Sequence, residues 1–206
     1  QLKAFFDIIQ VLIRNNKILA YHDRSDGGLI TCLLEMSFAG HTGMDININI
    51  DDNDVSNFLF NEELGAVIQV SDKESDFVLQ SLQKSIGSAI SIIGKPRIDQ
   101  NIILNNNKNT IFNGVRSHLQ QIWSETSFRI QALRDNPKTA SEEYENILDD
   151  LDPGISPKVN FDIPTININK LKPKIAILRE QGINGHNEMA AAFHYAGFET
   201  HDVHMS

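Results

Sequence analysis

The stretch YHDRSDGGL, residues 21–29, lies between two apolar segments and decides how the chain around it folds. Before it, the short apolar run over residues 18–20 predicts a strand. After it, apolar residues recur at helical spacing as far as Ala39, and Asp26 is placed to cap this helix at its N-terminus. The pattern therefore predicts a strand, a polar turn with two glycines, and the beginning of a helix.

Two kinds of site fit this polar turn. Backbone N–H groups at a helix N-terminus attract anions, phosphate especially. Asp23 is a candidate ligand for a hard divalent cation, because Mg²⁺ bound beside a nucleotide takes only one or two protein carboxylates. The same composition is also typical of a purely structural Asx turn followed by a capped helix. The residues alone leave these readings open, as they do whether His22 faces a ligand or a hydrogen bond within the turn.

The first half of the chain alternates helical and strand patterns. Such alternation predicts a layered α/β or α+β domain in which helices cover one sheet. Glu62 and Glu63 are interpreted as solvent-facing, since adjacent side chains on a helix or turn point apart. The expected helices span 2–15, 29–39, a short segment through 58–60, and 72–86; the expected strands span 43–50, 66–70, 89–93, 102–104 and 110–112.

The second half begins with a longer helical pattern over 115–133, in which Trp123 is assigned to a buried apolar stripe. A further helix is expected over 140–148, followed by a polar, proline-punctuated stretch typical of a linker. The last part predicts one βαβ unit, the first of a doubly wound sheet. Its strand, glycine-bearing loop, helix and second strand are expected over 174–178, 182–185, 188–196 and 198–203.

Three long motifs resemble one family. AYHDRSDGGLITCLLEMSFAGHTGMDI, residues 20–46, and FNEELGAVIQV, residues 60–70, resemble the second synthase half of the single-chain phosphoribosylformylglycinamidine synthases of purine biosynthesis. PKIAILREQGINGHNEMAAAFHYAGFETHDVHMS, residues 173–206, resembles the opening of the C-terminal glutaminase domain of that family. Because members of the family are several times longer, the chain is expected to be a piece of a larger protein.

The resemblance implies three parts. Residues 1–114 would form a domain like the C-terminal domain of aminoimidazole ribonucleotide synthetase, whose ATP-binding partner domain lies outside this chain. Residues 115–172 would form a helical and extended linker, and residues 173–206 the start of a truncated class I glutamine amidotransferase domain. The cysteine, histidine and glutamate that such a glutaminase uses would lie downstream, so no catalytic residue is assigned here.

The resemblance also implies an activity. The parent would be an ATP- and glutamine-dependent ligase that converts formylglycinamide ribonucleotide to formylglycinamidine ribonucleotide, working with the remaining domains of the same chain. Asp23 matches the Mg²⁺ ligand of the family and Ser25 its contact to ATP or ADP. We expect this piece to be inactive by itself. An alternative reading is a non-catalytic module that binds a nucleotide and docks neighbouring domains.

The amino-acid composition argues against several other classes of protein. A formal charge of −9 and a pI near 5.2 argue against a nucleic-acid footprint, and no basic run suggests an anionic membrane surface. No stretch approaches transmembrane length. The single cysteine, Cys32, is interpreted as a small buried apolar residue in a reducing compartment, because one thiol makes no intrachain disulfide. A cytoplasmic location is expected.

Overall fold

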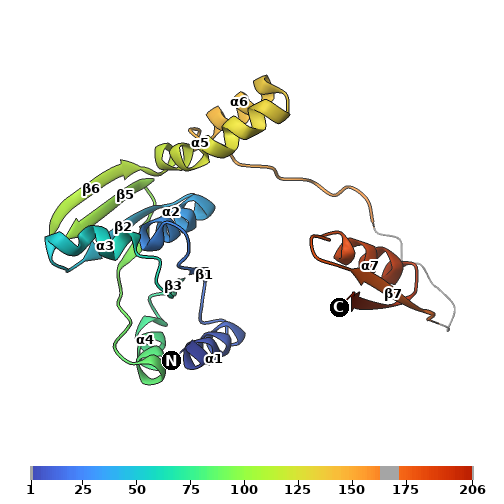
Figure 1. Cartoon of the computed structure of the whole chain (residues 1–206), viewed down its shortest axis with the longest axis horizontal. Coiled ribbons are helices and arrows are strands. Elements are labelled where there is room, and N and C mark those ends of the chain that lie inside the picture. Colours follow the sequence, from blue (N-terminus) through green and yellow to red (C-terminus); the bar gives the residue numbers. More distant parts are fainter. Residues whose placement is uncertain (1, 163–171, 206) are drawn as a thin grey trace. The chain divides into compact units, whose positions relative to one another are not determined.

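The computed structural model describes residues 2–162 and 172–205 (Figure 1). It divides into two compact units, Gln1–Pro153 and Gly154–Ser206. The first unit contains the sheets and helices around the 21–29 stretch, and the second contains the predicted βαβ unit. None of the helices in the described ranges is both long and apolar enough to cross a membrane.

A four-stranded sheet forms the centre of the first unit. Its strand order is β4-β2-β5-β6, in which β2 and β5 run parallel and the other two pairs are antiparallel. Alternate residues of β2 and β5, such as Ile46 and Leu104, point to one face and pack against α2 and α3. The bounds are α2 Gly28–Gly40, β2 Gly43–Ile48, α3 Val55–Phe60, β4 Gly94–Arg97, β5 Asn101–Asn106 and β6 Asn109–Val115, with a 3-10 turn at Asp52–Asp54 before α3.

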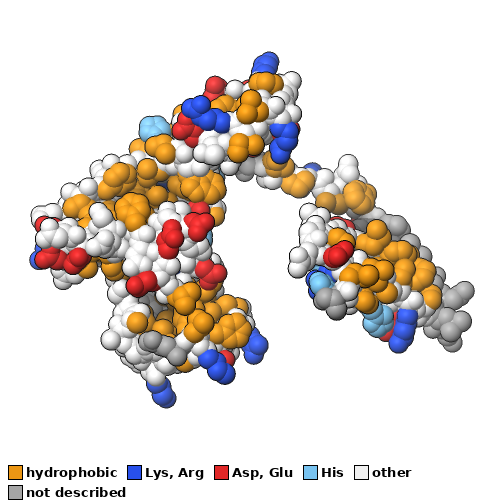
Figure 2. Space-filling view, viewed as in Figure 1, with side chains coloured by type: hydrophobic (Ala, Val, Ile, Leu, Met, Phe, Trp, Pro, Cys, Tyr) orange, Lys and Arg blue, Asp and Glu red, His pale blue; other side chains and the backbone are white. Residues whose placement is uncertain are grey.

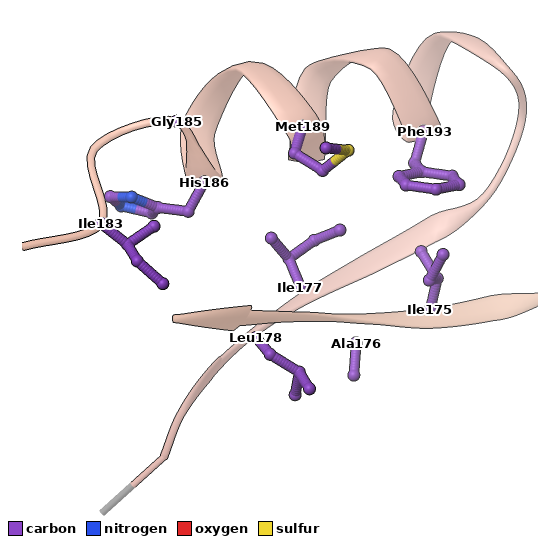
Figure 3. A pocket seen from close by; sticks show the side chains of 9 residues that line it. All are labelled: Ile175, Ala176, Ile177, Leu178, Ile183, Gly185, His186, Met189 and Phe193. Atoms are coloured by element: carbon purple, nitrogen blue, oxygen red, sulfur yellow. The ribbon is translucent and has the colours of Figure 1, made fainter. Parts of the chain in front are cut away.

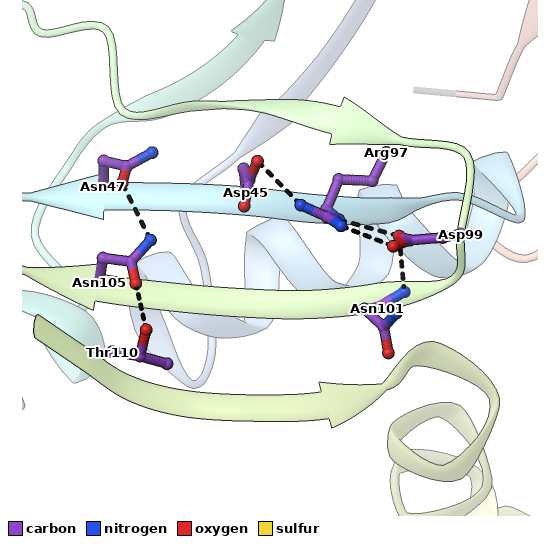
Figure 4. A network of polar contacts seen from close by, with 7 residues as sticks. All are labelled: Asp45, Asn47, Arg97, Asp99, Asn101, Asn105 and Thr110. Atoms are coloured by element: carbon purple, nitrogen blue, oxygen red, sulfur yellow. Dashed lines mark hydrogen bonds and ion pairs between the residues drawn. The ribbon is translucent and has the colours of Figure 1, made fainter. Parts of the chain in front are cut away.

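The other face of this sheet carries polar side chains in two networks (Figure 4). The guanidinium of Arg97 lies 3.0 Å from Asp45 and 2.8 Å from Asp99, and this contact lowers the pKa of the Asp99 carboxyl. A second network runs across three strands, because Asn105 donates to Asn47 and Thr110 donates to Asn105. These contacts stabilise the register of a sheet whose apolar residues lie on the opposite face.

A smaller antiparallel pair, β1 (Ala20–Asp23) with β3 (Ala66–Gln69), connects this core to a second one. There, α1 (Leu2–Arg14) and α4 (Ser75–Ile86) lie side by side (Figure 1). Their contact buries Ile9, Leu12, Val78 and Leu82.

Two strand predictions in this half were wrong. The strand expected at 18–20 begins only at Ala20 and continues to Asp23, because hydrogen bonds to β3 extend through the polar residues. The strand expected at 89–93 is not formed in the described chain, and β4 starts directly after it. Pairing with β2 begins at Gly94, opposite Ile46, where a β-carbon would overlap the Asp45 carbonyl.

Helix α5 (Arg116–Arg134) and helix α6 (Pro137–Asn146) follow the sheet and pack on each other. The rings of Phe128 and Tyr144 stack between them at 4.3 Å. Trp123 was predicted to be core and is instead 55 % exposed, although its ring lies 5.8 Å from that of Phe38 on α2. Its apolar neighbours further along the helix, Ile130 and Leu133, are exposed as well.

Arg116, at the start of α5, is fully buried and holds α5 and α6 on the first unit. Its guanidinium forms an ion pair with Asp150, which follows α6, and donates to the side chain of Gln100. This ion pair lies within the compact unit that ends at Pro153.

The second unit is the expected βαβ arrangement. Strands β7 (Lys174–Arg179) and β8 (Glu199–His204) pair in parallel, and α7 (His186–Tyr195) crosses between them. In Figure 3, Ile175 and Ile177 point toward α7, whereas Ala176 and Leu178 point to the other side of β7. Leu178 is 57 % exposed, so among the described residues of this unit nothing covers that face of the two-stranded sheet, as expected for a parallel unit with a helix on one side only. Figure 2 shows many hydrophobic side chains on the surface of this unit.

Candidate functional site

The polar turn of residues 21–29 is held by the segment 62–65, from the second motif quoted above. Strand β1 pairs with β3 as far as Asp23 opposite Ala66. Directly after it, the Arg24 amide donates to the Gly65 carbonyl at 2.9 Å, and the Arg24 side chain donates to the Glu63 carbonyl at 2.6 Å. Two motifs that lie about forty residues apart in the sequence therefore form one site.

Glycine is required where the turn enters helix α2. Gly27 and Gly28 have φ values of 80° and 73°, a left-handed backbone that other residues rarely adopt. A β-carbon on Gly28 would also lie 2.6 Å from the Phe60 carbonyl carbon. The predicted capping role of Asp26 is wrong, because Gly27 occupies the cap position and no side chain caps the helix from there.

Two N–H groups at this helix start are already engaged. Gly27 donates to the Glu62 carboxylate at 2.9 Å, and Gly28 donates to the Ser25 carbonyl at 3.0 Å. The expectation that Glu62 only faces solvent was incomplete, since its negative charge lies at the positive end of the α2 dipole. An anion could reach the Gly27 amide only by displacing Glu62.

Asp23 lies at the end of β1 with its carboxylate exposed. Its Oδ1 accepts a hydrogen bond from the Tyr21 hydroxyl at 2.6 Å. Burial and the neighbouring Asp23 charge raise the pKa of Tyr21 to about 12, so the hydroxyl stays protonated and keeps donating. Within the described residues Oδ2 has no partner, and this oxygen is free to bind a cation.

These residues fit a Mg²⁺ ion that is bound mainly by its nucleotide. In the described parts of the chain, no group of three or more His, Cys, Asp or Glu side chains could enclose a metal. A single carboxylate with one free oxygen is nevertheless compatible with Mg²⁺ beside phosphates, because Mg²⁺ keeps several waters and takes only one or two protein carboxylates there. Ser25, two residues further, is exposed, and its hydroxyl has no partner among the described residues.

His22 faces the protein, which settles the question left open by the sequence. Its Nε2 lies 2.8 Å from Glu35 Oε2, and its Nδ1 lies 2.6 Å from the Asp23 carbonyl oxygen. Trp123 donates to the other Glu35 oxygen at 3.1 Å. The sequence did not predict the contacts among His22, Glu35 and Trp123. The one available signal was the glutamate, Glu35, among the apolar residues of α2.

Cys32 lies on α2 beneath this group and is 2 % exposed, which confirms that it is a buried residue. Its thiol points to the His22 carbonyl oxygen at 3.7 Å. Burial raises the pKa of the thiol to about 11, so the reactive thiolate is scarce at neutral pH. Cys32 therefore packs under the site as an unreactive side chain.

Comparison with known proteins gives a domain match at each end of the chain. Residues 1–101 match the family described as AIR synthase related protein, C-terminal domain, and residues 172–206 match the CobB/CobQ-like glutamine amidotransferase domain. The fold is similar to three structures from Thermotoga maritima: PurL complexed with FGAR, PurL complexed with ATP, and phosphoribosylformylglycinamidine synthase II. The chain thus carries a match to a synthase-type domain followed by a match to a glutamine amidotransferase domain.

The structural likeness to these three proteins concerns the fold. Each of the three has 12 % identity and a TM-score of 0.50 over 57 % of this chain. The chain spans about a fifth of their length, 20 % of the PurL chain with FGAR and 21 % of the other two. Asp23 and Ser25 both lie within the matched synthase-type domain, whereas α6 lies outside both matched regions.

Proposed function

We propose that this chain is part of an ATP-dependent ligase that converts formylglycinamide ribonucleotide to formylglycinamidine ribonucleotide with nitrogen from glutamine. The order of the two matched domains carries the proposal, because a synthase-type domain followed by a glutamine amidotransferase domain joins ATP-driven chemistry to an ammonia source. The PurL structures named for FGAR and for ATP support the same substrates. The partners would be these substrates and the other domains of the full-length protein.

Within this ligase, the chain would contribute a nucleotide site at the end of β1. Asp23 would bind Mg²⁺ through its free Oδ2, and the Ser25 hydroxyl would contact ATP or ADP. When bound, Mg²⁺ offsets the phosphate charge that the Asp23 carboxylate would otherwise repel. Tyr21 fixes the other Asp23 oxygen, and residues 62–65 hold the backbone of the turn.

Each of the three expected parts of the chain would have its own role. Residues 1–114 would carry the nucleotide site, residues 115–172 would connect it to the glutaminase, and residues 173–206 would begin that domain. The segment alone would be inactive, because the glutaminase catalytic residues are expected elsewhere. Formation of ADP from ATP by the isolated chain, dependent on formylglycinamide ribonucleotide and glutamine, would contradict this.

We also propose that the protein works in the cytoplasm. The lone thiol of Cys32, buried and without a disulfide partner, is typical of a reducing compartment. A fluorescent fusion of the full-length protein that accumulates outside the cytoplasm would overturn this assignment.

Replacing Asp23 tests the site. Calorimetric titration of the 206-residue chain with Mg·ADP should show binding, and Asp23→Ala should weaken it by about 10- to 100-fold because the one protein ligand to the metal is lost. The matched control is Asp26→Ala, which removes an exposed carboxylate three residues away and should bind like the wild type. Equal binding by the Asp23 variant and the wild type, or no binding by either, would contradict a nucleotide site at Asp23 in this segment.

A further inference from the structure

Glu35 connects three elements of the first unit through its two carboxylate oxygens. It lies on α2, where Oε2 is 2.8 Å from His22 of β1 and Oε1 is 3.1 Å from the indole nitrogen of Trp123 on α5. The side chains of His22 and Glu35 are each 30 % exposed, so the pair is partly screened from water. Both Glu35 oxygens are therefore used in contacts between elements.

These contacts fix the imidazole of His22 in one orientation. The Asp23 carbonyl oxygen can only accept a hydrogen bond, so His22 Nδ1 donates to it across 2.6 Å. The opposite ring nitrogen, Nε2, lies 2.8 Å from Glu35 Oε2. The backbone of Asp23 is thus held by a side chain that Glu35 orients, while its carboxylate is held by Tyr21.

Trp123 extends the same group to α5. Its ring lies 5.8 Å from that of Phe38, which is buried on α2, and its indole N–H points at Glu35. Although Trp123 is 55 % exposed, both the ring and the N–H have partners on α2. A displacement of Asp23 transmitted through His22 and Glu35 would consequently reach the Trp123 indole.

We propose that Glu35 is a positioning residue for the metal and nucleotide site, acting through His22 on Asp23 and linking that site to α5 through Trp123. The inference rests on the proposed function, because it takes Asp23 as the Mg²⁺ ligand. Partners in the outer shell of a metal ligand typically change metal affinity by about 10- to 100-fold when they are lost. Glu35 would not itself bind the metal, because it acts only on the orientation of Asp23.

The test compares ADP affinity with Mg²⁺ and with EDTA, in wild type and in Glu35→Ala, for the whole chain. A positioning role predicts that the affinity ratio, the dissociation constant in EDTA divided by the dissociation constant in Mg²⁺, falls about tenfold in Glu35→Ala, because only the metal-dependent part of binding is lost. General loss of structure would weaken binding with and without Mg²⁺ alike. Glu35→Gln should recover part of the ratio, since its amide oxygen still accepts a hydrogen bond, and it serves as the second variant should Glu35→Ala fold poorly.

Trp123 supplies an independent readout, because it is the only tryptophan and gives one indole N–H resonance. We expect this resonance to shift in Glu35→Ala and to shift on addition of Mg·ADP to the wild type. Trp123→Phe, which keeps a ring against Phe38 but removes the N–H donor, should change the affinity ratio less than about twofold, because it leaves His22 and Asp23 in place.

The outcomes are distinct. An unchanged affinity ratio in both Glu35 variants, with wild-type binding intact, overturns the positioning role alone. An indole resonance unaffected by Mg·ADP overturns the link to α5. Absence of Mg·ADP binding by the wild type overturns the proposed site, and the positioning role with it.

Discussion

Replacing Arg116 by alanine is expected to lower the free energy of unfolding of the first unit by about 3–5 kcal/mol. The guanidinium is fully buried, and its partners are Asp150 at 2.5 Å, Gln100 at 2.5 Å and Gln120. Removing the cation leaves the Asp150 charge and two amide oxygens without their donor and opens a cavity at the start of α5. The loss should therefore release α5, α6 and the chain that follows them.

Denaturation in urea, followed by Trp123 fluorescence, measures this effect in the whole chain. Trp123 is the single tryptophan and lies on α5, so its signal reports the first unit only. The control is Arg134→Ala, which removes an exposed arginine that pairs with Asp135 at the other end of the same helix. That variant should unfold like the wild type, because exposed ion pairs contribute little. Equal midpoints for the two variants would contradict the anchoring role of Arg116.

Gly28→Ala is expected to cost about 3–5 kcal/mol, the sum of left-handed backbone strain and a steric clash. The new methyl would lie 2.6 Å from the Phe60 carbonyl carbon and 2.8 Å from the Leu59 carbonyl oxygen. Because both are backbone atoms, relief requires α2 and the end of α3 to move apart. The same movement would pull residues 62–65 away from the turn, so Mg·ADP binding should be lost together with stability.

Gly87→Ala separates the effect of backbone strain from that of the steric clash. Gly87 also has a positive φ, 82° with a ψ of −146°, a conformation that is open essentially to glycine alone, but no atom lies within 4 Å of the position its β-carbon would take. Its cost should be backbone strain without a clash, about 1–3 kcal/mol, and Mg·ADP binding should be unchanged. Urea denaturation of the two variants side by side measures the difference. Equal losses would mean that the contact between Gly28 and α3 is unimportant.

Local patterns predicted most of the regular elements. Helices α1 and α5 were placed within one residue at each end, because apolar residues at helical spacing and clear end signals mark them. The βαβ unit was also predicted correctly, since its glycine-bearing loop separates two apolar strands. Such features depend on residues that are close together in the chain.

The errors and omissions concern partners far apart in the sequence. The apolar run 89–93 has the composition of a strand, but pairing with β2 selects Gly94–Arg97 instead. The ion pair of Arg116 with Asp150 spans 34 residues, and the hydrogen bond of Trp123 to Glu35 spans 88. No local spacing encodes such contacts, so the buried position of Arg116 was not predicted and the indole of Trp123 was wrongly assigned to the core.

The candidate site likewise combines features that nearby residues predict with contacts between residues far apart in the sequence. Asp23 and Ser25 were proposed from a resemblance in the motif itself, and the structure adds that both side chains are exposed at one turn. The supporting contacts from Glu62, Glu63 and Gly65 come from the second motif and could be recognised only once β1 and β3 are paired. The resemblance thus named candidate ligands, while the fold shows what holds them.

The most direct test replaces Mg²⁺ by paramagnetic Mn²⁺, which carboxylates bind in the same way. In ¹H–¹⁵N spectra of the chain with ADP, a small amount of Mn²⁺ should broaden the amides of residues 22–28 and of the bracing segment 62–65 first. Asp23→Ala should remove this broadening at the same Mn²⁺ concentration. Broadening centred elsewhere, for example at the polar network of Asp45 and Asp99, would contradict a metal and nucleotide site at the end of β1.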